Sequence, residues 1–102
     1  MSEDRRILLV DDEPGIRTTL SISLMDMGYD VATAESGEKA LDMFDADDPP
    51  IVLTDIKMPG IDGIELLRKL KNRNPHTEVI MITGHGDMEL AIESLKNEAT
   101  DF

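Results

Sequence analysis

Short, largely apolar segments recur along the chain and alternate with segments of helical periodicity. Residues 7–10, 51–54 and 79–82 are almost entirely aliphatic, and residues 29–34 form a weaker segment of the same kind. Runs of this length bounded by polar residues are typical of strands buried in a parallel sheet. The pattern therefore predicts strands that alternate with helices.

Between these strands, apolar residues recur every three or four positions, as in amphipathic helices. Pro14 suits a first helical turn, Gly28 ends the first helix, Ser36 can cap the second, and Asn74 with Pro75 stops the third. The residues expected to face the core are Ile16, Leu20, Leu24 and Met27, then Ala40, Leu41 and Phe44, then Ile64, Leu67 and Leu70, and finally Met88, Ile92, Leu95 and Ala99. Strand-helix alternation with right-handed crossovers predicts a doubly wound α/β sandwich.

Three carboxylates stand at the ends of predicted strands. Asp11 and Asp12 follow the first strand, and Asp55 follows the third. Ligands bind outside the carboxyl ends of the strands in such sheets, so the three acids share one pocket if these strands are neighbours. Crowded like charges raise one another's pKa unless a cation neutralises them. An all-oxygen ligand set of this kind indicates Mg2+.

The composition narrows the class of protein. A chain of 102 residues has the size of one domain. The absence of cysteine excludes disulfides and thiolate metal sites and fits the cytoplasm. The N-terminal pattern predicts no signal sequence or membrane span. A net charge of -12 argues against direct nucleic-acid binding. The basic stretch 68–73 is a solvated helix face or, alternatively, a docking patch for an acidic partner.

The strand-end residues suit phosphoryl transfer. Asp55, beside Mg2+ held by Asp12 with Asp11 nearby, could accept a phosphoryl group as an aspartyl-phosphate. Positioning and charge neutralisation supply most of the catalysis in such reactions. Thr83, at the end of the fourth strand, offers a hydroxyl to a phosphoryl oxygen, and Gly84 leaves room for it.

Two motifs resemble those of a known family. They are the acidic pair with Glu13 and Pro14, and residues 54–63, Thr-Asp-Ile-Lys-Met-Pro-Gly-Ile-Asp-Gly. Over its whole length the chain resembles the receiver domains of two-component response regulators, and residues 81–87 resemble receivers of ATPase-type activators of the nitrogen-regulator class. The resemblance implies one receiver domain over residues 1–102, with a flavodoxin-like three-layer fold and strand order 2-1-3-4-(5).

The resemblance also assigns roles to the acids. It implies that Asp55 takes a phosphoryl group from a sensor histidine kinase. Asp12, Asp55 and the main-chain carbonyl of Lys57 would ligate Mg2+, with Asp11 acting through water. The domain would catalyse its own phosphorylation and dephosphorylation without being a turnover enzyme.

Further residues are implicated in switching. By resemblance, Thr83 carries the switch hydroxyl, and Phe102 is its aromatic partner or simply packs in the core. Lys57 and His85 match positions that tune the lifetime of the phosphoryl group in this family; alternatively, both side chains are solvated. The conformational change would control an output domain, which is expected to regulate transcription, in the same longer chain or in a partner. A phosphorylation-dependent homodimer is left open.

The chain departs from the family at its end. The family's lysine on strand five would fall beyond Phe102, and the last strand and helix are expected to be largely missing. We therefore expect a receiver domain that is incomplete at its C-terminus and belongs to a longer gene product.

Two alternatives remain. A phosphate-independent pseudo-receiver would be a pure interaction module; the acid pair, Asp55 and Thr83 argue against it, whereas the absent lysine keeps it open. A phosphatase of the haloacid-dehalogenase type also uses an Mg2+-bound aspartate, but that family has a second acid two residues later, where this chain has Lys57.

Overall fold

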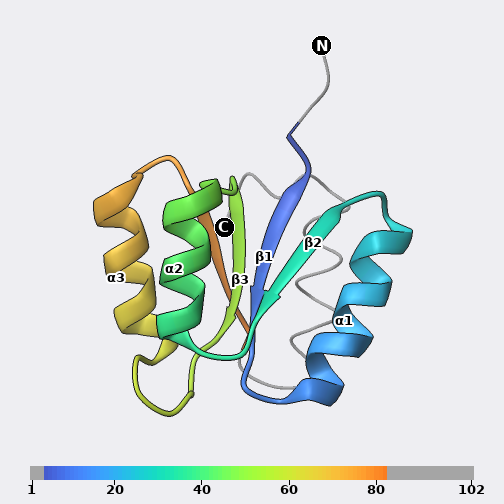
Figure 1. The fold of residues 1–102 in the computed structure, drawn as a ribbon, viewed down its shortest axis with the longest axis horizontal. Helices are drawn as coiled ribbons and strands as arrows, with labels where there is room; N and C mark the ends of the chain where they lie inside the picture. Colours follow the sequence, from blue (N-terminus) through green and yellow to red (C-terminus); the bar gives the residue numbers. More distant parts are fainter. Residues whose placement is uncertain (1–3, 83–102) are drawn as a thin grey trace.

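The computed structural model describes residues 4–82 as alternating strands and helices (Figure 1). In chain order the elements are β1 (Arg6–Val10), α1 (Pro14–Asp26), β2 (Asp30–Ala34), α2 (Gly37–Asp47), β3 (Ile51–Asp55), α3 (Gly63–Arg73) and β4 (Glu78–Ile82). The strands begin and end within one residue of the bounds predicted from the apolar segments. No helix within residues 4–82 is both long and apolar enough to cross a membrane.

The described strands form one parallel sheet in the order β2-β1-β3-β4. β1 lies between β2 and β3, with Ile7 opposite Val31 on one side and Ile51 on the other. The predicted α/β class and the order 2-1-3-4 are thereby confirmed. The predicted helix that carries Met88, Ile92, Leu95 and Ala99 lies outside the described residues.

The sheet has an apolar cluster on each face. Successive side chains of a strand point to opposite faces, so alternate residues of β1 belong to different clusters. Ile7 and Leu9 pack with Leu20 and Leu24 of α1. The other cluster includes Leu8 and Val10 of β1, Phe44 of α2, and Leu66 and Leu70 of α3. α1 therefore covers one face, and α2 and α3 cover the other, which gives three layers (Figure 1).

The helix ends largely follow the predicted signals. Pro14 is the first residue of α1, and Gly28 follows that helix with a φ of 94°. The Ser36 side chain accepts a hydrogen bond from the Lys39 backbone N–H at 3.1 Å and caps α2. Asn74 is the C-cap of α3.

The inward face predicted for the third helix is wrong at one position. Ile64 is 47% exposed, whereas Leu66 is fully buried. The buried face runs through Gly63, Leu66 and Leu70, because Gly63 packs directly against the end of β3 and fixes the rotation of the helix. Ile64 is one position after Gly63, and each residue advances about 100° around a helix, so its side chain turns away from the core.

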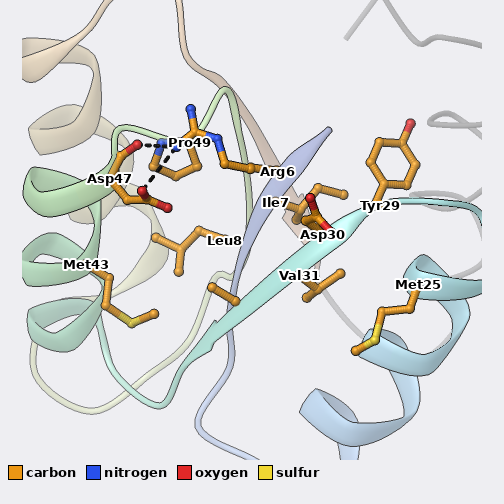
Figure 2. A pocket seen from close by; sticks show the side chains of 11 residues that line it. Arg6, Ile7, Leu8, Met25, Tyr29, Asp30, Val31, Met43, Asp47 and Pro49 are labelled. Atoms are coloured by element: carbon orange, nitrogen blue, oxygen red, sulfur yellow. Dashed lines mark hydrogen bonds and ion pairs between the residues drawn. The ribbon is translucent and has the colours of Figure 1, made fainter. Parts of the chain in front are cut away.

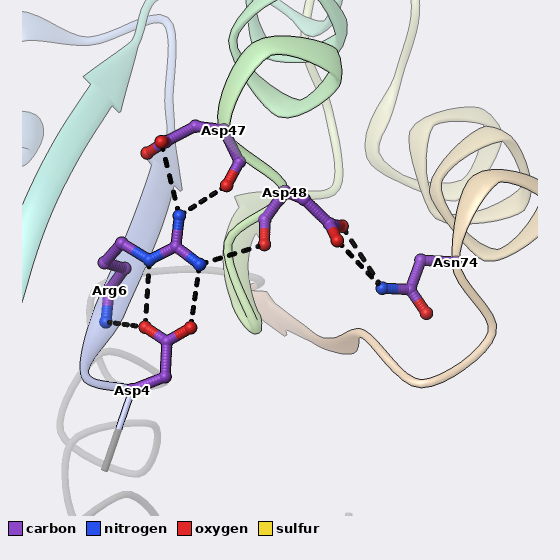
Figure 3. A network of polar contacts seen from close by, with 5 residues as sticks. All are labelled: Asp4, Arg6, Asp47, Asp48 and Asn74. Carbon is purple, nitrogen blue, oxygen red and sulfur yellow. Dashed lines mark hydrogen bonds and ion pairs between the residues drawn. The ribbon is translucent and has the colours of Figure 1, made fainter. Parts of the chain in front are cut away.

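A polar network joins three elements at the amino ends of the strands (Figure 3). The Arg6 guanidinium donates to the Asp4 carboxylate at 2.9 and 2.7 Å and to the main-chain carbonyls of Asp47 and Asp48. Asp48 has a φ of 45° as the C-cap of α2, and its carboxylate accepts a hydrogen bond from Asn74 at 3.1 Å. β1, the end of α2 and the end of α3 are thus tied together, far along the strands from the acidic residues.

Candidate functional site

The acidic residues gather at the carboxyl ends of β1 and β3. Asp11 and Asp12 directly follow β1, and Asp55 is the last residue of β3. Parallel pairing of Val10 with Thr54 sets these strand ends side by side. One carboxylate oxygen from each acid lies within 4.8 Å of the other two. The structure thus brings together the three acids that the sequence places at strand ends.

Asp11 is the buried member of this acidic cluster, at 3% exposed, while Asp12 is exposed and Asp55 is half-buried. The Asp11 carboxylate accepts a hydrogen bond from the Glu13 N–H at 2.9 Å. Burial raises the pKa of Asp11, and repulsion by Asp55, Asp12 and Glu13 raises it further, although the bond from Glu13 opposes the shift. Ionised carboxylates this close together repel one another. The cluster is therefore an unfavourable arrangement that a cation would relieve.

The loop after Asp55 closes tightly on the end of β3. The Gly63 N–H donates to the Ile56 carbonyl at 2.8 Å. A Cβ atom at position 63 would lie 2.3 Å from the Asp55 carbonyl oxygen, so any side chain there would force the backbone to shift. Gly60 within this loop has a φ of 78°, a conformation that favours glycine. Residues 56–63 thus form a compact turn that returns the chain to α3 directly beside Asp55.

Residues 7–102 match the family described as "Response regulator receiver domain". The chain belongs to this family. Receiver domains are regulatory phosphoacceptors, and they bind Mg2+ at an acidic pocket.

The receiver domain is similar in sequence to curated transcriptional regulators. It is 44% identical over 98 residues to the C4-dicarboxylate transport transcriptional regulatory protein DctD of Pseudomonas aeruginosa, covering 95% of this chain and 21% of that protein. It is 38% identical over 94 residues to the DNA-binding transcriptional regulator NtrC of Klebsiella pneumoniae, covering 92% of this chain and 20% of that protein. The chain thus spans about a fifth of the length of these relatives. The similarity to NtrC agrees with the predicted likeness to receivers of the nitrogen-regulator class.

Solved structures share the fold of the receiver domain. The response regulator TrrA from Thermotoga maritima, in complex with Mg2+-BeF, is 37% identical and has a TM-score of 0.77, with 95% of this chain and 82% of that chain covered. A structure of the histidine kinase ThkA in complex with TrrA matches with 41% identity and a TM-score of 0.74, covering 79% of this chain and 72% of that one.

The remaining predicted site residues fall into two groups. Lys57 is exposed in the loop that follows Asp55. Residues Thr83, Gly84, His85 and Phe102 lie outside the described part of the chain. The Ile56 N–H donates to the carbonyl of Ile82 at 3.3 Å, so the end of β4 lies against the start of the loop that follows Asp55.

The acidic cluster of the receiver domain fits Mg2+. This ion binds oxygen at about 2.0–2.1 Å in an octahedron, so its ligand oxygens lie roughly 3 Å apart when adjacent and 4 Å apart when opposite. Three carboxylate oxygens within 4.8 Å of one another need only small movements to meet this geometry. Mg2+ also keeps several bound waters, which suits the exposed position of Asp12.

Arg17 is a further residue at the site, and the sequence motifs did not predict it. Its Nη1 atom donates a hydrogen bond to the main-chain carbonyl of Asp11 at 2.6 Å. A cation in the first turn of a helix is unfavourable with the helix dipole. The placement of an arginine at the start of α1, five residues after Asp12, was the available signal that its side chain has another partner.

A pocket of about 420 Å³ lies elsewhere, around the amino-terminal halves of β1 and β2 (Figure 2). Figure 2 shows Met25 of α1 and Met43 of α2 on either side of Val31 of β2. Asp11, Asp12 and Asp55 do not line it. A shallower depression of about 520 Å³, lined by Ile56, Lys57, Met58, Pro59 and Asp62, belongs to the loop after Asp55 and adjoins the acidic cluster.

Proposed function

We propose that this receiver domain accepts a phosphoryl group on Asp55 from a sensor histidine kinase and transmits that event to an output domain. The observation that carries the proposal is the convergence of Asp11, Asp12 and Asp55 at two adjacent strand ends. The structure of the histidine kinase ThkA in complex with the response regulator TrrA supports a histidine kinase as the partner. The names of the curated relatives, as transcriptional regulators, support an output domain that controls transcription.

In the proposed reaction, an oxygen of the Asp55 carboxylate attacks phosphorus. The bond from phosphorus to the histidine nitrogen of the kinase breaks, and that nitrogen keeps the electron pair. Asp12, Asp55 and the main-chain carbonyl of Lys57 would hold Mg2+, with Asp11 acting through water. When bound there, Mg2+ would supply positive charge that offsets the negative charge of the carboxylates and of the phosphoryl group. The Mg2+-BeF complex of TrrA supports this assignment.

The switching residues complete the proposal. The Thr83 hydroxyl would bond a phosphoryl oxygen with space left by Gly84, and Phe102 would respond by packing inward. Lys57 and His85 are candidates for tuning the lifetime of the phosphoryl group. The proposal includes autocatalysed phosphorylation and dephosphorylation, and it allows a phosphorylation-dependent homodimer. It places the domain in the cytoplasm, without direct contact with nucleic acid or membrane.

The proposal is tested by incubating the chain with acetyl phosphate in the presence and absence of Mg2+. We expect an Mg2+-dependent mass increase of one phosphoryl group, stable in acid, labile in base and located at Asp55 by peptide mapping. Asp55→Asn should abolish the adduct, and Asp12→Asn should raise the Mg2+ concentration that it requires. Steady release of phosphate from many monoesters would favour a phosphatase instead. No adduct at all, in a chain extended through the strand-five lysine, would favour the pseudo-receiver.

A further inference from the structure

Arg17 lies at the start of α1 and reaches back to the loop that carries the acids. Its side chain is half-buried, and its Nη1 atom lies 2.6 Å from the Asp11 carbonyl oxygen. We infer that Arg17 is a positioning residue, which holds the loop between β1 and α1 so that Asp11 and Asp12 face Asp55 before any metal binds. This inference rests on the proposed function of the acidic cluster as an Mg2+ site.

Three polar groups of Asp11 are bonded, each to a different residue. Its N–H donates to the Ala34 carbonyl at 3.1 Å, at the end of β2. Its carboxylate accepts from the Glu13 N–H at 2.9 Å. Its carbonyl accepts from Arg17. That carbonyl belongs to the peptide group between Asp11 and Asp12, so the bond from Arg17 fixes the peptide plane from which the Asp12 side chain departs.

The junction between this loop and α1 lacks the usual side-chain cap. Glu13 is the N-cap residue, and within the described part of the chain its side chain makes no capping hydrogen bond. The Arg17 N–H bonds the Glu13 carbonyl at 3.1 Å as the first helical turn requires, while its side chain bonds the carbonyl two residues earlier. Arg17 therefore connects the acidic loop to the helix through both its main chain and its side chain.

Charge and positioning predict opposite effects on metal binding. Guanidinium is a cation, so its charge alone weakens Mg2+ binding nearby, and removal of the charge would tighten binding. Loss of the bond to Asp11 instead frees the loop and weakens binding, because groups that orient metal ligands contribute strongly to affinity. The sign of the change in Mg2+ affinity of an Arg17 variant therefore distinguishes the two roles.

The test measures Mg2+ affinity by isothermal titration calorimetry for wild type, Arg17→Ala, Arg17→Lys and Arg68→Ala. Arg68 is an exposed residue of α3, so its variant makes the same charge change away from the acids. We expect Arg17→Ala to bind Mg2+ about tenfold more weakly. Arg17→Lys, which keeps one donor and the charge, should have an intermediate affinity, and Arg68→Ala should match wild type.

A second readout separates positioning from a general loss of structure. Circular dichroism should show the same secondary structure in all four proteins. The Mg2+ concentration for half-maximal phosphorylation by acetyl phosphate should rise about tenfold in Arg17→Ala. The rate at saturating Mg2+ should return to the wild-type value, because the defect is in metal affinity alone.

Three results would overturn the inference: Arg17→Ala binding Mg2+ as tightly as wild type or more tightly, Arg17→Lys binding no better than Arg17→Ala, or Arg68→Ala losing as much affinity as Arg17→Ala. Failure of the proposed function has a different signature. In that case wild type itself shows no Mg2+ binding, or Asp12→Asn binds Mg2+ as wild type does.

Discussion

Asp11 combines burial with hydrogen bonding that holds it against two other acids. Its exposed fraction is 3%, and its carboxylate lies with those of Asp12 and Asp55 inside a 4.8 Å cluster. Nothing in the packing of the fold requires a carboxylate there, because an amide could accept the same bond from Glu13. An acid at this position therefore costs stability that a bound cation recovers, as is common at functional sites.

Asp11→Asn should raise the melting temperature of the metal-free protein at neutral pH. Because the pKa of Asp11 is raised by burial, folding is favoured when this group is protonated. That advantage is complete below the unfolded-state pKa of about 3.9 and is lost as the pH rises through the folded-state pKa. The difference in melting temperature between variant and wild type should therefore be near zero below about pH 3.9 and should grow above it.

Asp42→Asn is the matched control, because Asp42 is an exposed residue of α2 and its substitution makes the same change in charge. Thermal unfolding of the three proteins, followed by circular dichroism across the pH range, gives the comparison. A pH-independent difference for Asp11→Asn, or an equal one for Asp42→Asn, would contradict the role assigned to burial and like charges at Asp11.

At the scale of elements, the start of α3 is set by contact with β3 rather than by helix-forming tendency. The side chain of Asp62 accepts from the Glu65 N–H at 2.9 Å and caps the helix. Gly63 then passes so close to the Asp55 carbonyl that a Cβ would meet it at 2.3 Å. The same contact determines which residues of α3 face the core and where the Asp55 backbone lies.

Gly63→Ala should lower the free energy of unfolding by about 1–3 kcal/mol, because the added methyl group must displace backbone. Gly15→Ala is the control: apart from the chain neighbours and the backbone of its own helix, no atom of the described residues lies within 4 Å of a Cβ at position 15 of α1. That substitution should be neutral or stabilising by up to about 1 kcal/mol through helix propensity. Urea unfolding gives both values. Equal effects at the two glycines would show that the end of β3 yields easily to α3.

Pattern and propensity predicted the elements well, because apolar runs and caps are local signals. The segments 7–10 and 51–54 became β1 and β3, and Ser36 caps α2 as expected. Ile64 was placed wrongly because the rotation of α3 depends on a contact between Gly63 and another element. Distant contacts of this kind leave no periodic trace in a sequence.

The candidate site, like the fold, has a part that the sequence predicts and a part that it does not. The three acids could be predicted to meet because strand ends of a parallel sheet share one edge, and the structure brings them together. The contact of Arg17 with Asp11 could not, because a long side chain can reach many partners. The roles of Thr83 and Phe102 stay predictions, since both residues lie outside the described part of the chain.

At the scale of the whole molecule, the two ends of the sheet have different roles, one in the candidate metal site and the other in stability. The carboxyl ends of β1 and β3 carry the acidic cluster, while the amino ends are tied by Arg6 to the C-terminus of α2 (Figure 3). The Asp4 and Arg6 side chains are partly exposed to solvent, so salt and low pH weaken the interaction between them. Changes at the amino ends should alter stability without altering metal binding at the carboxyl ends.

Arg6→Ala should lower the melting temperature and leave Mg2+ affinity unchanged. The hydrogen bond with Arg6 lowers the pKa of Asp4, so the stabilisation from this pair is present at neutral pH and is lost as the pH falls through the folded-state pKa. The loss in melting temperature should thus shrink in acid and at high salt, as measured by circular dichroism. A change in Mg2+ affinity, measured by calorimetry, would show that the two ends are coupled.

The position of β1 in the middle of the sheet has a consequence for the newborn chain. β1 is made first, yet Ile7 pairs with Ile51, which is 51 − 7 = 44 residues later. At translation rates of about 5–20 residues per second, β1 waits roughly 2–9 seconds for that neighbour to be synthesised. During this interval its aliphatic side chains are candidates for capture by chaperones or by other chains. The acidic site, whose two halves belong to β1 and β3, comes into existence only when that wait ends.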